Sequence, residues 1–274
     1  MKTGVWAATA AALVLLTGVA KADLLADIQK KGELVVGVLG TDEPNSFIDP
    51  KTRELVGYDV DLGKAVAAKL GVKPVFKQIT IAARIPELQQ GHIDLLAASL
   101  THSKEREAQI DFSLTTFVTG TKVLVRANSG IKDVPELAGK RVVTAKGSSM
   151  EVNMRNAVPS ANIITFDTSP QAFVALQQGK AVGYVNEDAS LARSLNQIGD
   201  KRSEYKILPT NLAVEPLALG IKKGEANLKK VVDETLRELE ASGKAEALYE
   251  HWFGQQSALK MPKREFKIDT DKID

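Results

Sequence analysis

The regular alternation of short apolar runs with amphipathic segments restricts the fold of this chain more than any other feature. Apolar runs such as 34–39, 93–98 and 141–145 predict buried strands, and segments with helical spacing of their apolar residues lie between the strands. Gly71 and Gly179 each follow such a segment, as expected where a helix ends. Alternating strands and helices form parallel sheets with helices on both faces, so we expect an α/β fold.

The full pattern contains two successive cycles of strands and helices. The expected strands are 34–39, 72–79, 93–98, 118–126, 141–145, 162–166, 181–185 and 217–222. The expected helices are 60–70, 85–91, 103–109, 148–157, 169–178, 187–198, 227–241 and 244–253. From Met261 onward the chain is charged and has no periodicity, so we expect an irregular tail. Sheets of this kind bind ligands at the carboxyl ends of their strands.

The amino-terminal residues indicate export from the cytoplasm. Lys2 precedes an apolar, alanine-rich stretch, Val5–Val19, and Ala20-Lys21-Ala22 has the small-residue pattern of a cleavage site. We therefore expect residues 1–22 to be a signal peptide and the mature chain to begin at Asp23. An uncleaved membrane anchor is the alternative, but the apolar stretch is short for a bilayer span.

Charge and cysteine content exclude several partners and cofactors. Removing residues 1–22 removes two lysines, which leaves 34 basic side chains against 34 acidic ones. A neutral chain lacks the basic excess that binding to nucleic acid requires. Because there is no cysteine, we expect neither a disulfide nor a closed tetrahedral zinc site. We expect a monomer that needs no metal or cofactor.

The sequence contains none of the common catalytic motifs. The P-loop pattern, G-x-S-x-G and H-E-x-x-H are all absent. The histidines, His92, His102 and His251, lie far apart in the sequence. Glu187 and Asp188 form a suggestive acidic pair, but adjacent residues at the start of a helix point in different directions. We therefore predict no catalytic residues.

Polar side chains gather instead at the turns between strands and helices. Ser99 and Thr101 offer hydroxyl groups directly after the strand at 93–98. Arg106 offers a guanidinium group that can hold a carboxylate through two bonds. Ser148 begins a helix whose free backbone N–H groups attract anions. Together these groups could hold one carboxylate from two sides.

Charged side chains at two further turns complete a set suited to a zwitterion. Glu187, or Asp188 beside it, follows the strand at 181–185 and could accept hydrogen bonds from an ammonium group. Arg84 begins the helix after the strand at 72–79 and adds a second cation. Each candidate also has a purely structural interpretation, as a helix cap, a partner of a helix dipole or a surface charge. The residues alone leave both interpretations open.

A set of segments in the same order along nearly the whole chain carries a family resemblance. These segments are Gly32–Val38, Leu55–Leu62, Arg84–Asp94, Thr101–Arg106, Asp111–Ser113, Ile131–Val143 and Lys244–Gly254. The chain resembles the family 3 periplasmic solute-binding proteins of polar amino acid ABC transporters. The resemblance implies two α/β lobes, each a mainly parallel sheet flanked by helices, with the ligand in the cleft between them. It also implies two hinge crossings, near 117–121 and 213–217, so that residues 23–118 and 216–274 form lobe 1 and residues 119–215 form lobe 2.

The resemblance also implies a role for each candidate side chain. The family's carboxylate-binding arginine corresponds to Arg106, and its hydroxyl and backbone contacts correspond to Ser99, Thr101 and Ser148. Its ammonium-binding aspartate corresponds to Glu187. The extra methylene of glutamate moves the carboxylate, so Asp188 beside it could hold the ammonium group instead.

Within the family, the stretch 80–85 most resembles glutamate- and aspartate-binding proteins, which place an arginine at the position of Arg84 to meet the ligand's side-chain carboxylate. Ile81 stands where binders of cationic or amide ligands often have an aromatic ring. Glutamate and aspartate binders usually add a basic residue in the first loop. Here the loop 39–43 has none and contains Asp42, which could instead meet a second amino group.

We therefore expect a periplasmic, substrate-binding component of an amino acid ABC importer. It would bind glutamate or aspartate by hinge closure and deliver it to the membrane permease. One alternative is a periplasmic enzyme of the same fold, such as a dehydratase acting on a small carboxylic acid, with Glu187 as its acid. Another is a sensor module whose closed form is recognised by a signalling partner.

Overall fold

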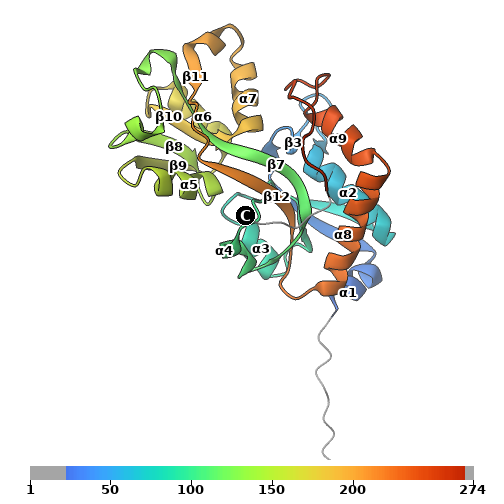
Figure 1. Ribbon diagram of the computed structural model, residues 1–274. Coiled ribbons are helices and arrows are strands. Elements are labelled where there is room, and N and C mark those ends of the chain that lie inside the picture. Colours follow the sequence, from blue (N-terminus) through green and yellow to red (C-terminus); the bar gives the residue numbers. More distant parts are fainter. Residues whose placement is uncertain (1–22, 269–274) are drawn as a thin grey trace, which may run out of the picture.

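The computed structural model describes residues 23–268 and shows two lobes joined by a pair of long strands (Figure 1). Lobe 1 contains β1 (Glu33–Val38), β5 (Lys73–Gln78), β6 (Leu95–Leu96), α1 (Leu24–Lys31), α2 (Tyr58–Leu70), α3 (Arg84–Gln89), α4 (Lys104–Glu107), α8 (Ala226–Ala241) and α9 (Lys244–Trp252). Lobe 2 contains β8 (Arg141–Ala145), β9 (Asn162–Phe166), β10 (Gly183–Glu187), β11 (Tyr205–Ile207), α5 (Ser149–Ala157), α6 (Ser169–Gln177) and α7 (Asp188–Gln197). The connecting strands are β7 (Asp111–Arg126) and β12 (Ala213–Ile221).

One hydrogen-bonded sheet passes through both lobes. Its strand order is β5-β1-β6-β12-β7-β10-β8-β9, and β11 pairs with β7. The pairs β1 with β5 and β6, and β8 with β9 and β10, are parallel, whereas β7 and β12 run antiparallel to each other and to their neighbours. The expected two-lobed α/β fold with two hinge crossings is confirmed.

The two crossing strands are hydrogen-bonded to each other where they pass between the lobes. Thr121 lies opposite Ala213, and Phe117 lies opposite Leu217. The register then shifts after Leu217, which marks an irregularity on the lobe 1 side. The lobe boundaries expected at 118 and 215 fall inside this paired segment. The exact residues at which one lobe ends and the other begins stay a prediction.

Each lobe has apolar cores on both faces of its part of the sheet. In lobe 1 one core packs under α2, α8 and α9, and the other packs under α3. In lobe 2 one core packs against α5 and the other against α6 and α7. Representative fully buried residues of these cores are Val36, Leu62, Val232, Leu88, Ile110, Val142, Met154, Leu176 and Leu191. Because each lobe has its own cores, it can move as a unit.

The structure differs from the expected elements mainly at the start of the chain and around the crossing. Helix α1 was not predicted, although Asp23 caps its first turn and Gly32 ends it with a positive φ of 73°. A small antiparallel sheet of β2 (Thr41–Asp42), β3 (Ser46–Ile48) and β4 (Leu55–Val56) was also not predicted. Strand β7 begins at Asp111 rather than at 118 because it enters lobe 1 to pair with β12.

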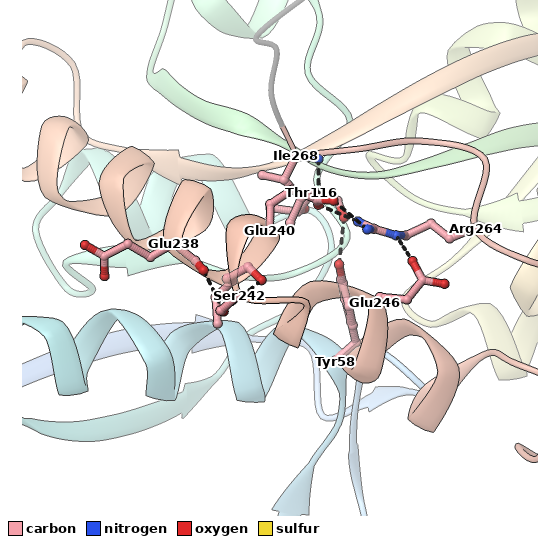
Figure 2. A network of polar contacts seen from close by, with 9 residues as sticks. Tyr58, Thr116, Glu238, Glu240, Ser242, Glu246, Arg264 and Ile268 are labelled. Atoms are coloured by element: carbon pink, nitrogen blue, oxygen red, sulfur yellow. Dashed lines mark hydrogen bonds and ion pairs between the residues drawn. The ribbon is translucent and has the colours of Figure 1, made fainter.

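The carboxy-terminal segment after α9 has no helix or strand up to residue 268, which agrees with the irregular tail expected from Met261 onward. Specific polar bonds fix this segment to lobe 1 (Figure 2). The Nη1 and Nη2 atoms of Arg264 each lie 2.7 Å from an oxygen of Glu240, and its Nε lies 2.8 Å from Glu246. The backbone N–H of Ile268 donates to Glu240 at 3.0 Å. Next to this network, the ring of Phe266 meets Phe117 of β7 edge-on at 5.2 Å.

We expect Arg264→Ala to lower the free energy of unfolding by about 2 kcal/mol, because it removes three charge-assisted hydrogen bonds from a side chain that is 5% exposed. Urea unfolding followed by circular dichroism measures this loss. Arg237→Ala, at an exposed position of α8, is the matched control and should change the value by less than about 0.5 kcal/mol. Equal changes in the two variants would contradict a stabilising role for the tail.

Candidate ligand-binding site

A pocket lies between the two lobes. It encloses about 450 Å³, open solvent included. Its charged lining side chains are Asp42, Arg84 and Glu187. Its hydroxyl groups come from Thr41, Ser99, Ser148, Ser149, Ser169 and Ser190, and its apolar wall comes from Leu39, Ile81 and Met150. No aromatic ring is among the described residues that line it, so the pocket suits a small polar ligand rather than one that stacks on a ring.

The two lobes touch at one edge of this pocket, so the structure represents a closed cleft. Gly147 of lobe 2 has a φ of 73°, and a Cβ atom added to it would lie 3.1 Å from the Cα atom of Ala82 in lobe 1. Glycine is therefore required both by the backbone conformation and by the close approach. The carbonyl oxygen of Gly147 also accepts hydrogen bonds from Nη2 of Arg84 at 3.4 Å and from Nη2 of Arg106 at 3.5 Å.

Arg84, the first residue of α3, brings a buried positive charge to the pocket. Within lobe 1 its guanidinium group donates to neutral backbone carbonyls, at 2.9 Å to Ile81, 3.0 Å to Ala98 and 2.9 Å to Ser99. No carboxylate of the described residues lies within 4.0 Å of it. Burial, together with the charge of Arg106, lowers the pKa of Arg84 to about 9, so it keeps its charge at neutral pH. An anionic group of a ligand would supply the missing counter-charge.

Two acidic side chains face the same pocket. Glu187 ends β10 and is buried, and it accepts a hydrogen bond from Ser190 at 3.3 Å. Burial, and then the charge of Asp42, raises the pKa of Glu187 well above its ordinary value. Asp42 in β2 is half-buried, and burial raises its pKa as well. An ammonium group would stabilise the ionised form of either carboxyl group.

Ser99 is held in an unusual conformation between two carboxyl groups of lobe 1. Its φ of 46° lies in the left-handed region, which is uncommon for residues other than glycine. Its backbone N–H donates to Asp59 at 2.8 Å, and its hydroxyl donates to Asp42 at 2.5 Å. Burial raises the pKa of Asp59 to about 7. These bonds fix the Ser99 hydroxyl on the wall of the pocket.

A buried carboxylate on the crossing strand β12 forms the second polar centre of the cleft. Glu215 accepts hydrogen bonds through Oε2 from Thr101 at 2.7 Å and from Ser149 at 2.6 Å. Through Oε1 it accepts from Thr121 at 2.6 Å and from the side-chain amide of Asn153. Glu215 does not line the pocket itself but an adjoining hollow.

The structure brings most of the sequence-predicted residues together, but not all of them line the pocket. Four do so, namely Arg84, Ser99, Ser148 and Glu187. Thr101 and Arg106 line the adjoining hollow instead, and Nη1 of Arg106 donates to the carbonyl oxygen of Thr101 at 2.9 Å. Asp188 is turned away from the pocket, because it pairs with Lys122 at 2.8 Å and accepts the backbone N–H of Gly120 at 3.1 Å.

Sequence reasoning missed several groups of the cleft, among them Asp59, Glu215 and Ser190. Asp59 was noted only within the segment 55–62 that carries the family resemblance, Glu215 only within a crossing, and Ser190 only in the interior of a helix. The signal for Glu215 was present in the sequence, since it is a lone acid between Ala213 and the apolar run that ends at Ile221. A charged residue in such a run is rarely buried without partners.

Other kinds of site find no support in residues 23–268. Within this part of the chain, no cluster of three or more histidine, aspartate or glutamate side chains could hold a metal ion. No helix in the same part has the length and apolar composition needed to cross a membrane. The expected signal peptide, residues 1–22, lies outside the described residues.

A closed cleft lined by hydroxyl and charged groups, between two lobes that share paired crossing strands, defines a ligand-binding protein of the hinged type. Residues 34–255 match the family described as bacterial extracellular solute-binding proteins, family 3, and the chain belongs to this family. This confirms the family expected from the sequence.

The relatives of this chain differ in what their names say they bind. The chain is 31% identical over 242 residues to the ABC transporter glutamine-binding protein GlnH of Bacillus subtilis (strain 168), and the match covers 87% of each protein. It is 33% identical over 262 residues to the glutamate/aspartate import solute-binding protein of Escherichia coli (strain K12), covering 88% of this chain and 86% of the relative. A solved structure of an ancestral arginine-binding protein bound to arginine superposes with a TM-score of 0.76 at 34% identity, covering 81% of this chain and 99% of that one.

These relatives establish the general role and leave the ligand open. They are binding proteins by name, and this chain, as a member of the same family of solute-binding proteins, is a binding protein as well. Because glutamine, glutamate or aspartate, and arginine all occur among their ligands, the glutamate/aspartate subgroup expected from the sequence is not resolved by similarity.

Proposed function

We propose that this protein, as the substrate-binding component of an amino acid ABC transporter, captures glutamate or aspartate. The observation that carries the choice of ligand is Arg84, a buried cation that lines the pocket with no carboxylate within 4.0 Å among the described residues. A buried charge is tolerated when it is paired, so the pocket is best completed by a ligand with a negatively charged side chain. The relative from Escherichia coli, a glutamate/aspartate import protein, supports this choice.

In the proposed complex each charge of the ligand has a partner. The ammonium group lies against Glu187, and the side-chain carboxylate lies against Arg84. The α-carboxylate lies at the start of α5, where Ser148 and Ser149 line the pocket and free backbone N–H groups attract an anion. These partners come from both lobes, so a bound ligand bridges them. A ligand that bridges both lobes binds the closed state better than the open one and shifts the population towards it.

A second candidate ligand is an amino acid with a side-chain amide, such as glutamine. The observation that favours it is Asp42, which lines the same pocket as Arg84. A side-chain amide could accept from Arg84 through its oxygen and donate to Asp42 through its nitrogen, whereas glutamate would bring a negative charge close to Asp42. The glutamine-binding relative from Bacillus subtilis is consistent with this alternative.

The proposal includes a location and a partner. The protein acts in the periplasm as a monomer after removal of residues 1–22, and the closed form docks on the membrane permease. Membership of an extracellular family supports a location outside the cytoplasm. Edman sequencing of the protein purified from its native compartment tests the cleavage, and we expect the mature chain to begin at Asp23.

A thermal-shift screen followed by calorimetry tests the ligand. Ligands that bind only the native state raise the unfolding temperature. We expect glutamate and aspartate to give larger shifts than glutamine, and arginine to give none. A shift with glutamine and none with glutamate would replace the first candidate with the second. A shift with arginine alone would contradict both, because Arg84, the one cationic side chain among the described residues that line the pocket, would then face a cationic ligand.

Binding should depend on pH through Glu187. In the empty pocket the raised pKa of Glu187 favours its neutral form, and the ligand's ammonium group favours the carboxylate. Binding therefore releases a proton, and affinity rises as the pH increases from the ordinary value of 4.5 towards the raised pKa. Calorimetry in two buffers of different ionisation enthalpy, at about pH 5.5 and about pH 8, measures the proton release. Identical heats in both buffers at the lower pH would contradict this prediction, and Glu187→Gln should abolish the release.

A further inference from the structure

We propose that Glu215 is a positioning residue that ties together hydroxyl and amide groups of both lobes and thereby favours the closed cleft before any ligand binds. The inference does not depend on which amino acid is the ligand. It concerns a carboxylate on the crossing strand β12 that lies outside the pocket proposed for the ligand.

The contacts of Glu215 span the cleft. Thr101 belongs to lobe 1, whereas Ser149 and Asn153 belong to helix α5 of lobe 2. All three donate to Glu215, and the hydroxyl oxygens of Thr101 and Ser149 also lie 2.9 Å from each other. Thr121 on the paired strand β7 completes the set. One carboxylate therefore joins both lobes and both crossing strands.

Because Glu215 is buried, its carboxylate depends on each of these donors to stabilise its charge. Its side chain is 2% exposed, and no lysine, arginine or histidine of the described residues lies within 4.0 Å. A buried carboxylate that lacks an ion pair depends on neutral hydrogen-bond donors, and losing one leaves part of its charge unsolvated. Because Thr101 and Ser149 sit on opposite lobes, opening the cleft separates them and removes donors from Glu215. Closing the cleft restores these bonds, so the closed state is favoured.

The same contacts affect how the hydroxyl groups can serve a ligand. A hydroxyl group has one hydrogen to donate, and the hydroxyl oxygens of Thr101 and Ser149 lie within hydrogen-bond distance of Glu215 and of each other, so both hydrogens are used inside this cluster. Of the two, Ser149 also lines the pocket, so its oxygen offers a lone pair to a ligand there. Ligand carboxylates are then left to Arg84 and to backbone N–H groups at the start of α5, and the lone pair of Ser149 can accept from a donor of the ligand.

Interlobe distances measured without ligand test the proposal directly. The chain has no cysteine, so spin labels can be attached at the exposed positions Ala68→Cys on α2 and Lys180→Cys in lobe 2. In the otherwise unchanged protein we expect a large population at the short distance of the closed cleft. In Glu215→Gln we expect the ratio of closed to open molecules to fall at least about tenfold, because the amide cannot accept four hydrogen bonds and loses charge-assisted ones.

Two further variants separate this role from a general loss of stability. Asp233→Asn alters a buried carboxylate on α8 that bonds Leu114 and Lys229 away from the cleft, and it should leave the distance distribution unchanged. Thr101→Val removes only the donor from lobe 1 and should shift the interlobe distances towards those of the open cleft. This variant tests the proposal even if Glu215→Gln fails to fold.

Binding kinetics provide a second measurement. With the amino acid that gives the largest thermal shift, Glu215→Gln should raise the dissociation rate about tenfold and change the association rate little. Either of two results would overturn the proposal. One is an open cleft in the unchanged protein without ligand, and the other is an unchanged distance distribution in both Glu215→Gln and Thr101→Val. Because the distances are measured without ligand, failure of the glutamate proposal would leave this result intact.

Discussion

Arg84→Met is expected to weaken glutamate binding by about 2–5 kcal/mol and to weaken glutamine binding far less. The reason is that the guanidinium group is the cation that lines the pocket and has no carboxylate partner among the described residues. A bound side-chain carboxylate would lose its counter-charge in a site from which water is largely excluded. Methionine retains much of the side-chain volume, so the loss reports on charge more than on packing. Isothermal titration calorimetry with each ligand measures the two losses.

The control for Arg84→Met must separate binding from folding. Arg84 also donates to the backbone carbonyls of Ile81, Ala98 and Ser99, so the unfolding temperature without ligand is measured in parallel. Arg237→Met removes an exposed arginine of the same lobe and should leave both affinities unchanged. Equal losses for glutamate and glutamine in Arg84→Met would remove Arg84 from the side-chain site.

Glu187→Gln is expected to weaken the binding of every amino acid ligand by about 2–5 kcal/mol, because all of them carry the same ammonium group. The buried side chain keeps its shape and loses the ability to become negatively charged when the ligand arrives. Calorimetry with glutamate, aspartate and glutamine should therefore give similar losses, in contrast to Arg84→Met.

Asp188→Asn is the natural comparison for Glu187→Gln, since the sequence alone could not distinguish the two acids. In the structure the Asp188 carboxylate faces the crossing strand β7, where it meets Lys122 and Gly120. We expect Asp188→Asn to retain most of the affinity. A larger loss in Asp188→Asn than in Glu187→Gln would show that the ammonium group lies against Asp188.

The strands and helices that surround the cleft could be predicted because each buries a continuous apolar run or face. The strand at 141–145 and the helix at 169–178 agree with β8 and α6 to within a residue at each end. The small sheet β2–β4 could not be predicted in this way, since its strands are two or three residues long and pair only with one another. Short pairings of this kind depend on tertiary contacts rather than on periodicity.

The site could be predicted in part, because polar residues after strands meet at one edge of a parallel sheet. That rule predicts from the sequence alone that Arg84, Ser99, Ser148 and Glu187 lie near one another. It does not give the direction of a side chain. The hydroxyl of Thr101, for example, donates to Glu215 and does not line the pocket. Glu215 is distant from Thr101 in the sequence, so the rule could not predict this contact.

The pairing of β7 with β12 through the crossing limits how the molecule can move. Two strands joined by a hydrogen-bonded ladder bend together as a ribbon and cannot slide past each other without breaking that ladder. We therefore expect the two lobes to rotate about one axis. One hinge angle would then describe every intermediate between the open and the closed state. A transporter that contacts the outer ends of both lobes could distinguish the closed from the open state by this angle. It would then bind the ligand-loaded form without contacting the ligand itself.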